Sequence, residues 1–230
     1  MRPKRKPTRT LVLLLTAGVL SLALTASAAA IVYVYGNGFS SRGAFKEIKR
    51  SGGGGKKCDK RYREKSKSMG ATVKGKRLCE FSPPVVGDAA QPDHVIFAKG
   101  QILPRRTPKA LRKSAYLAVK LRLGRGDWYE LEIRPKSGRY KLERSPNANA
   151  VSEAGRSDAI RKLNKPNALR LEAKGARIRA SVNGEELVSV VDPNPDQVGG
   201  RKVGFGIGSR KNSSRPTVGS FTRVRVGIAE

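Results

Sequence analysis

Residues 167–191 read NALRLEAKGARIRASVNGEELVSVV, and this stretch decides the fold class. Apolar side chains recur at every second position on both sides of Lys174-Gly175, which is the period of a half-buried strand. Asn183-Gly184 then precedes a third apolar run. Asn-Gly is a strong hairpin signal, because a type I′ turn needs positive φ at two successive residues. The stretch therefore predicts three antiparallel strands joined by tight turns.

The same alternation continues on both sides of this stretch. Further strand-like runs lie at residues 116–123, 128–134, 139–143, 202–207 and 220–226. Within 128–134, Tyr129, Leu131 and Ile133 share one face, and the acids Glu130 and Glu132 share the other. Many short strands separated by turn residues predict an all-β antiparallel sandwich or barrel.

The overall composition limits the classes of partner and site. The chain has 230 residues, with 48 Lys and Arg against 18 Asp and Glu, for a formal charge of +30. Such a charge favours a polyanionic partner or surface. One His and two Cys exclude most His/Cys metal clusters and a disulfide-dense scaffold. No nucleic-acid-binding motif accompanies the charge, and aromatic residues are few, so nucleic acid is not expected as a partner.

The N-terminus has the pattern of a membrane-targeting segment. Residues 1–10 form a basic tail without an acid, and residues 11–35 contain no charged residue. As a helix, these 25 residues would extend about 37 Å, enough for a bilayer core of ~30 Å. The basic flank keeps the tail in the cytoplasm. We therefore expect a single-pass signal anchor in the cell membrane, with everything that follows extracytoplasmic.

A cleavable signal peptide is the alternative. Residues 26–30, ASAAA, offer A-x-A cleavage sites, and cleavage would release a secreted protein. The continued apolar run at 31–35 favours the anchor. On either interpretation Cys58 and Cys79 lie outside the cytoplasm, where an oxidising environment favours a disulfide between them. In the chain-entropy model, that disulfide would contribute about 3 kcal/mol.

Residues 36–68 are predicted to be a basic, Gly-rich linker. They contain the run Gly52-Gly53-Gly54-Gly55 and 11 Lys and Arg against three acids. Glycine runs behave as flexible coil, and like charges extend them. The folded domain is accordingly expected to occupy residues 69–230, where the alternating pattern begins.

The order of elements resembles a known superfamily. The succession WYELEIRP, GRYKLER, KPNALRLEAKGARIRASVNGEELVSVVD, GGRKVGFGI and SFTRVRV looks like the concanavalin A-like lectin/glucanase superfamily. More narrowly, it looks like the laminin-G-like and sugar-hydrolase-related (DUF1080-type) bacterial domains. The resemblance covers roughly residues 69–230 and implies a jelly-roll sandwich of two antiparallel sheets. It is specific for the fold rather than for a function.

Glu130 and Glu132 are the candidate catalytic pair. They share a strand face, and paired carboxylates about 5–9 Å apart can hydrolyse glycosides. The glucanase relatives carry E-x-D-x-E on such a strand, whereas Arg134 stands at the third position here. The broken pattern favours the other interpretation, in which these acids form a solvated strand face with a Glu–Arg pair.

Asp192, Asn194 and Asp196 are the candidate metal ligands. Oxygen side chains at alternate positions are typical of calcium loops, so calcium is the one cofactor that the sequence suggests. The pattern then departs from such a loop, because Gln197 and Val203 stand where Gly and Glu would follow. The two intervening prolines indicate a rigid surface turn instead.

Basic residues on the polar faces of the strands are the candidate ligand-binding set. If the apolar residues face the core, these cations face outward: Lys120, Arg122, Arg134, Arg177, Arg179, Arg223 and Arg225. Arginine suits bidentate contact with phosphate, sulfate or carboxylate. A generally basic surface that serves solubility near an anionic membrane explains the same residues.

Three functions are compatible with the sequence. The first is a membrane-tethered, extracellular, lectin-like carbohydrate-binding module on the bacterial cell surface that holds a glycan or an anionic envelope polymer. The second is a glycoside hydrolase that uses Glu130 and Glu132. The third is a structural or protein-interaction domain. The broken acid motif favours binding over catalysis, and the sequence carries no signal for an oligomeric state.

Overall fold

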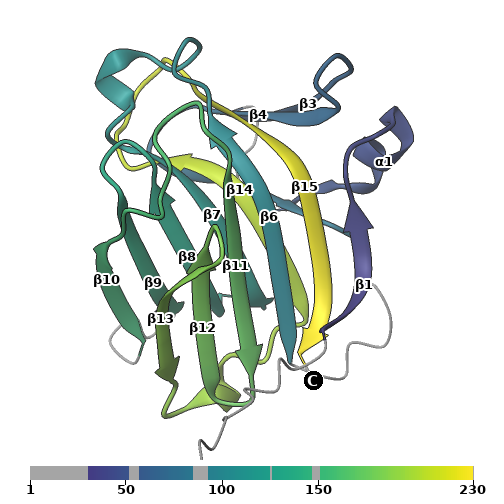
Figure 1. Cartoon of the computed structure of the whole chain (residues 1–230), viewed down its shortest axis with the longest axis vertical. Helices are drawn as coiled ribbons and strands as arrows, with labels where there is room; N and C mark the ends of the chain where they lie inside the picture. Colours follow the sequence, from purple (N-terminus) through teal and green to yellow (C-terminus); the bar gives the residue numbers. More distant parts are fainter. Residues whose placement is uncertain (1–30, 52–56, 85–92, 125, 147–150, 230) are drawn as a thin grey trace, which may run out of the picture.

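The computed structural model describes residues 31–51, 57–84, 93–124, 126–146 and 151–229. Within these ranges the chain forms a sandwich of two antiparallel β-sheets with very little helix (Figure 1). The helical elements are α1 (Arg42–Glu47) and two 3₁₀ turns, Lys109–Leu111 and Pro195–Gln197. The predicted all-β antiparallel sandwich is thus confirmed.

The first sheet, sheet A, contains eight strands. Its order is β13 (Glu185–Val191), β12 (Arg177–Val182), β11 (Asn167–Lys174), β6 (His94–Ile102), β15 (Thr217–Ala229), β4 (Ser68–Val73) and β3 (Cys58–Arg63). The long strand β15 pairs with β4 along its first part and with β1 (Ile31–Asn37) along its second part. Figure 1 shows β1 running beside β15 near the C-terminus.

The second sheet, sheet B, contains seven strands. Its order is β10 (Ser152–Arg156), β9 (Arg139–Ser145), β8 (Trp128–Arg134), β7 (Ala115–Leu123), β14 (Lys202–Ser209), β5 (Arg77–Ser82) and β2 (Lys49–Ser51). Every strand predicted by alternation is present. The Asn183-Gly184 hairpin has positive φ at both residues, 53° and 92°, as the sequence predicted.

The core lies between the two sheets and is built from the alternating apolar faces. An aromatic row joins the layers: the rings of Phe81 and Phe205 are 6.0 Å apart in sheet B, and Phe205 meets Phe221 of sheet A edge to face at 4.8 Å. All three are buried. Gly100 on β6 lies against the Phe221 ring, where an added Cβ would be only 2.6 Å from the ring carbons. This glycine is therefore required by the packing of the ring.

The predicted linker is wrong, because much of residues 36–68 belongs to the sandwich. β2 extends sheet B and β3 extends sheet A. Phe39 and Ile48 are fully buried in the common core. The abundant lysines and glycines suggested coil, but β3 alternates its partly buried and exposed positions and pairs with β4 in regular register. The sandwich therefore includes β1, β2 and β3 and does not start at Met69.

The predicted transmembrane helix over residues 11–35 cannot include its last five residues. Residues 31–35, predicted to complete a transmembrane helix, belong to strand β1. The basic tail and residues 11–30 lie outside the described residues. In the described part of the chain, no helix is long and apolar enough to cross a membrane.

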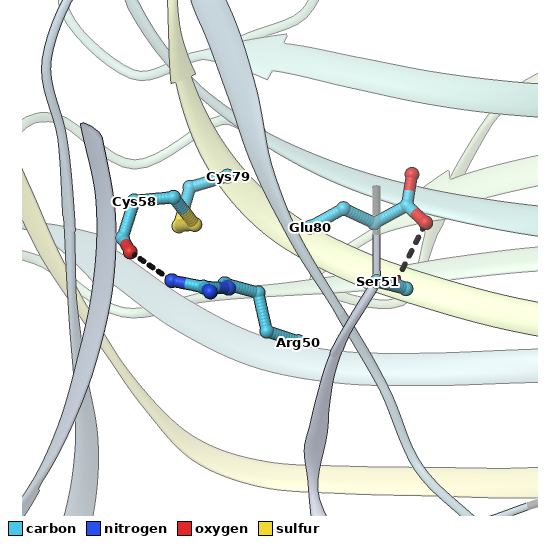
Figure 2. Close-up of a disulfide and its surroundings, with 5 residues drawn as sticks. All are labelled: Arg50, Ser51, Cys58, Cys79 and Glu80. Carbon is cyan, nitrogen blue, oxygen red and sulfur yellow. Dashed lines mark hydrogen bonds between the residues drawn. A yellow bond between two sulfur atoms is a disulfide. The ribbon is translucent and has the colours of Figure 1, made fainter. Parts of the chain in front are cut away.

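The disulfide between Cys58 and Cys79 is present, as predicted, and it links the two sheets. Cys58 begins β3 of sheet A and Cys79 lies on β5 of sheet B, with their Cα atoms 5.3 Å apart. Figure 2 shows Arg50 beside this bond, where its Nη1 donates to the Cys58 carbonyl at 2.8 Å. Glu80, the neighbour of Cys79, accepts a hydrogen bond from Ser51 Oγ at 2.8 Å. The bond thus fixes the strand that carries Glu80.

Removing residues before Met69 should prevent stable folding. A 69–230 fragment loses β1, β2, β3 and Cys58, which uncovers the edges of β4, β5 and the second part of β15. Exposed edges promote association between chains. We expect this fragment to aggregate and a 31–230 fragment to be a cooperatively melting monomer, as measured by size-exclusion chromatography and circular dichroism. Equal melting temperatures would contradict the assigned boundary.

Replacing both cysteines by serine should lower the free energy of unfolding by about 3 kcal/mol, because the bond closes a loop between residues separated by 21 positions. Urea unfolding of the two proteins measures the difference. A reducing agent should destabilise the wild type by a similar amount and leave the double variant unchanged. Two reactive thiols in the unreduced, denatured wild type would show that the bond does not form.

Candidate functional site

The outer face of sheet B, which points away from the core, is the candidate site. On an ordinary sandwich such a face is exposed, but here three of its charged residues are almost completely buried. The exposed fractions are 6% for Glu130, 2% for Glu132 and 8% for Lys120. Charged groups out of water must be paired to be tolerated.

Lys120 is the centre of the first group of charges. Its Nζ lies 3.1 Å from Glu80 Oε2 on β5 and 3.2 Å from Glu130 Oε2 on β8. Cross-strand register explains the second contact, because Lys120 on β7 stands directly opposite Glu130. The strand order places β14 between β5 and β7. Gly204 on β14 has no side chain, and an added Cβ would lie 3.2 Å from Glu80, so this glycine lets Glu80 reach across to Lys120.

Trp128 is the aromatic member of this group. The Lys120 ammonium lies 4.1 Å from the centre of its ring, a cation–π contact. The indole N–H is buried and has no hydrogen-bond acceptor among the described residues. Trp128, Lys120 and Glu80 line a cavity of about 410 Å³. The other lining residues are Ser51, Leu78, Ser82, Leu123, Gly124 and Lys202.

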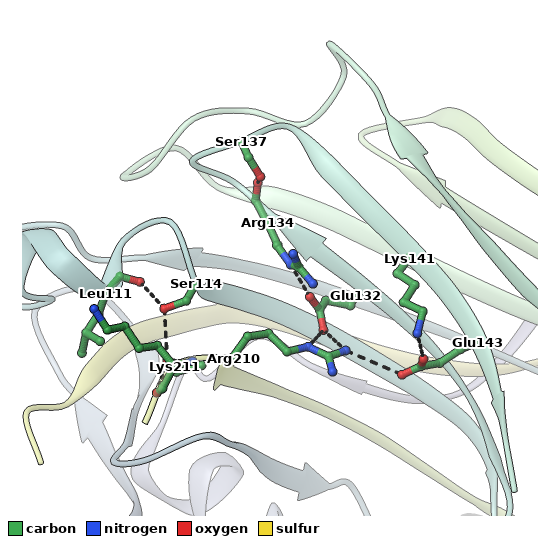
Figure 3. Close-up of polar contacts among 10 residues, drawn as sticks. Leu111, Ser114, Glu132, Arg134, Ser137, Lys141, Glu143, Arg210 and Lys211 are labelled. Carbon is green, nitrogen blue, oxygen red and sulfur yellow. Dashed lines mark hydrogen bonds and ion pairs between the residues drawn. The ribbon is translucent and has the colours of Figure 1, made fainter. Parts of the chain in front are cut away.

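Glu132 is the centre of the second group of charges, shown in Figure 3. Arg134 Nε donates to Glu132 Oε1 at 2.6 Å, and Arg210 donates to Glu132 Oε2 through Nε at 2.9 Å and Nη2 at 2.6 Å. Arg210 Nη2 also lies 3.6 Å from Glu143, which pairs with Lys141. Both oxygens of Glu132 are therefore occupied by guanidinium groups.

The pKa of Glu130 is shifted by its surroundings. Burial raises the pKa of Glu130 above its ordinary value of 4.5; Lys120 partly offsets this rise, and nearby Glu132 adds to it. A raised pKa in a cleft is typical of functional carboxyls. The raised pKa makes Glu130 a candidate proton donor, although its carboxylate is held by Lys120.

Arg122 does not face outward, contrary to the prediction from alternation. Its φ is +50°, beside an irregularity in the pairing of β7 with β14, and this reverses the direction of its side chain. Only 2% of Arg122 is exposed. Its Nη2 donates to the Gly175 carbonyl at 2.7 Å and lies 3.3 Å from Asp93 Oδ1. Arg122 is a structural residue and cannot contact an external ligand.

The predicted calcium loop is occupied by an arginine. Asp192 Oδ1 accepts from Arg144 Nη1 at 2.6 Å and from the Asn194 backbone N–H at 2.8 Å, and its Oδ2 accepts from Tyr129 at 2.5 Å. Burial alone would raise the pKa of Asp192, but these hydrogen bonds lower it. Asn194 and Asp196 are exposed, and no group of three His, Cys, Asp or Glu that could hold a metal occurs among the described residues. Arg144 thus supplies the positive charge that calcium would have supplied.

The other predicted arginines lie on sheet A. Arg177 and Arg179 are exposed on β12 on either side of buried Ile178, and Arg223 is exposed on β15. The fourth, Arg225, is partly buried on the same strand. β11 and β6 separate these two pairs, so the pairs share a sheet but not a single contact point. Their role in binding stays a prediction.

Sequence reasoning missed Trp128, Glu80 and Arg210. Trp128 is two positions before Glu130 in the alternating run 128–134, which places both side chains on one face of the strand. The same alternation could therefore have identified Trp128 as a residue of the site. Glu80 and Arg210 are 40 and 78 residues from the partners they meet, Lys120 and Glu132, and nothing local indicates those contacts.

Comparison with known proteins identifies the fold class. No family model matches the sequence, and no curated protein matches it. Among solved structures, the carbohydrate binding module CBM66 from Bacillus subtilis is similar at TM-score 0.51 and 14% identity, over 79% of this chain and 95% of that chain. A B. subtilis protein with a galectin-like fold gives TM-score 0.59 and 11% identity, over 88% and 99% of the two chains.

A prokaryotic β-1,3-1,4-glucanase from a mouse hindgut metagenome gives TM-score 0.58 and 12% identity, over 85% of this chain and 99% of that chain. At such identities the likeness shows the fold alone. The fold is a galectin-like, concanavalin A-like sandwich, which confirms the resemblance inferred from the order of strands.

Substituting Glu130 by glutamine should change how stability depends on pH. Because the folded pKa is raised above 4.5, the folded state binds more protons than the unfolded state between 4.5 and the raised value. The wild type therefore loses stability as the pH rises through that window, and E130Q lacks this loss. We expect equal stabilities at pH 4 and a more stable E130Q at pH 7.5, as measured by urea unfolding.

Lys120 remains paired with Glu80 in E130Q, so the substitution leaves no unpaired buried cation. A variant that is less stable than wild type at pH 7.5 would show that the Lys120–Glu130 attraction outweighs the cost of burial. E132Q is unsuitable for this test because two arginines depend on that carboxylate.

Proposed function

We propose that this protein is an extracytoplasmic glycan-binding module whose ligand lies on the outer face of sheet B, over Trp128. The observation that carries the proposal is the cavity of about 410 Å³ in which an indole ring stands beside Lys120 and Glu80. A pyranose has an apolar C–H face and a rim of hydroxyls, and such a cavity offers an aromatic surface together with fixed charged partners. Solved structures with this fold include a carbohydrate binding module and a glucanase, which supports the class of ligand.

A glycoside hydrolase is the second candidate. The raised pKa of Glu130 favours it, since a general acid must be protonated near working pH. The pairing of both acids opposes it. Glu132 accepts from two arginines, so a nucleophile or base at that position would have to break both contacts. Release of reducing ends by the wild type, abolished in E130Q, would assign hydrolysis instead of binding.

The proposed location rests on the disulfide and on the N-terminal sequence. A buried disulfide is typical of oxidising compartments outside the cytoplasm. With residues 31–35 in β1, the part of the uncharged run that a helical anchor could use is residues 11–30, which would extend about 30 Å as a helix. A membrane anchor of this length would hold the sandwich directly at the membrane surface, and cleavage near residue 30 would release it just before β1. The mass of the mature chain distinguishes these outcomes.

Trp128→Ala should weaken glycan binding at least tenfold while the protein stays folded. The ring is partly exposed at the cavity, so its loss removes the stacking surface but opens little of the core. Calorimetric titration with a panel of neutral and acidic oligosaccharides measures the affinity, and circular dichroism checks the fold. Trp128→Phe should retain an intermediate affinity because part of the ring surface remains.

The arginines of sheet A provide the contrasting variants. R177S/R179S and R223S/R225S change exposed or half-exposed side chains on the other sheet. If the ligand lies over Trp128, both variants bind it as the wild type does. Affinity that falls with these changes and with added salt, but not in W128A, would place the ligand on the basic face of sheet A instead.

A further inference from the structure

A second cavity, of about 360 Å³, lies where β8, β9 and β10 form the edge of sheet B. Its charged lining is entirely basic among the described residues. The lining consists of Arg134, Arg139, Lys141 and Arg156, together with Tyr140, Ala154 and Gly155. Such a lining suits an anion.

Three of these cations form one row across neighbouring strands. Arg134 on β8 stands directly opposite Arg139 on β9, and Arg139 stands directly opposite Arg156 on β10. Residues that stand opposite each other in antiparallel strands share a face, with Cβ atoms about 5 Å apart. We call Arg134, Arg139 and Arg156 the arginine row; it spans roughly 10 Å.

The arginine row is poorly compensated within the protein. Like charges directly opposite each other destabilise a sheet. Arg134 is paired with Glu132, but in the described part of the chain neither Arg139 nor Arg156 forms an ion pair, and both are exposed. Glu153 on β10 stands opposite Leu142, whose side chain is in the core, so Glu153 belongs to the other face. A bound anion would relieve this repulsion.

We propose that the arginine row binds a carboxylate or sulfate group of an acidic polysaccharide whose sugar ring lies over Trp128. This inference rests on the proposed glycan binding and narrows the ligand to an acidic glycan. Each guanidinium can form two parallel N–H···O bonds to such an oxyanion. Trp128 and Arg134 lie on the same face of β8, six residues or about 20 Å apart, so one oligosaccharide chain along the strand reaches both.

The test compares three probes and two charge-matched variants of the full-length protein. The probes are a sulfated glycan (heparin), a carboxylated glycan (oligogalacturonate) and a neutral glycan (laminarin oligosaccharide). R139Q/R156Q removes two charges from the arginine row, and R177Q/R179Q removes two from exposed positions on sheet A. We expect at least one acidic probe to bind at least tenfold more tightly than the neutral probe. R139Q/R156Q should abolish that preference, and R177Q/R179Q should retain it.

The outcomes separate this inference from the function on which it rests. Equal binding of acidic and neutral probes would overturn the arginine row as a site and leave glycan binding intact. Equal losses in both double variants would also overturn it, because the attraction would then come from net charge alone. Absence of binding to every probe would overturn the proposed function itself. Sulfate and carboxylate are distinguished by which acidic probe loses affinity in R139Q/R156Q.

Discussion

Sheet B buries side chains on both of its faces, and the charges buried on its outer face must be paired to remain there. Glu130, Glu132 and Lys120 are each less than a tenth exposed. Removing one partner from such a set leaves a buried charge without compensation, which typically costs about 3–5 kcal/mol. The set therefore fixes its own geometry: Lys120 lies between Glu80 and Glu130, and Glu132 lies between Arg134 and Arg210. The cavity beside Trp128 keeps its shape because separating these pairs is costly.

This constraint explains why the N-terminal part matters to the site. Glu80 is carried by β5, which is flanked at the sheet edge by β2 and tied to sheet A through Cys79. Ser51 on β2 donates to Glu80, so residues far from the central strands hold one end of the charge network. The segment that composition suggested was a spacer is a structural support for the candidate site.

The fold was largely predictable from the sequence, and the site only in part. Alternation and the Asn183-Gly184 turn specify strands locally, so most strands from β7 to β15 and their facing follow from the pattern. The face of Glu130 followed from the same alternation, whereas the pairing of Cys58 with Cys79 followed from their being the only two cysteines and from an expected oxidising compartment. The failures have local causes. The positive φ of Arg122 reverses the alternation, and Arg144 fills the loop that resembled a calcium site. Contacts such as Arg210 with Glu132 depend on the folded topology, which no short pattern encodes.

Arg134 belongs both to the charge network around Glu132 and to the arginine row. At the position where the glucanase motif places a third acid, it supplies a guanidinium that neutralises Glu132 at 2.6 Å. A carboxylate whose two oxygens accept charge-assisted hydrogen bonds from guanidinium groups must give up these contacts before it can act on a substrate. Arg134 is also the first member of the arginine row, which continues through Arg139 on β9 to Arg156 on β10. One residue thus pairs with a carboxylate at the centre of the face and contributes a cation to the row at its edge. Both contacts support the proposed binding of a charged glycan over the alternative of glycan cleavage.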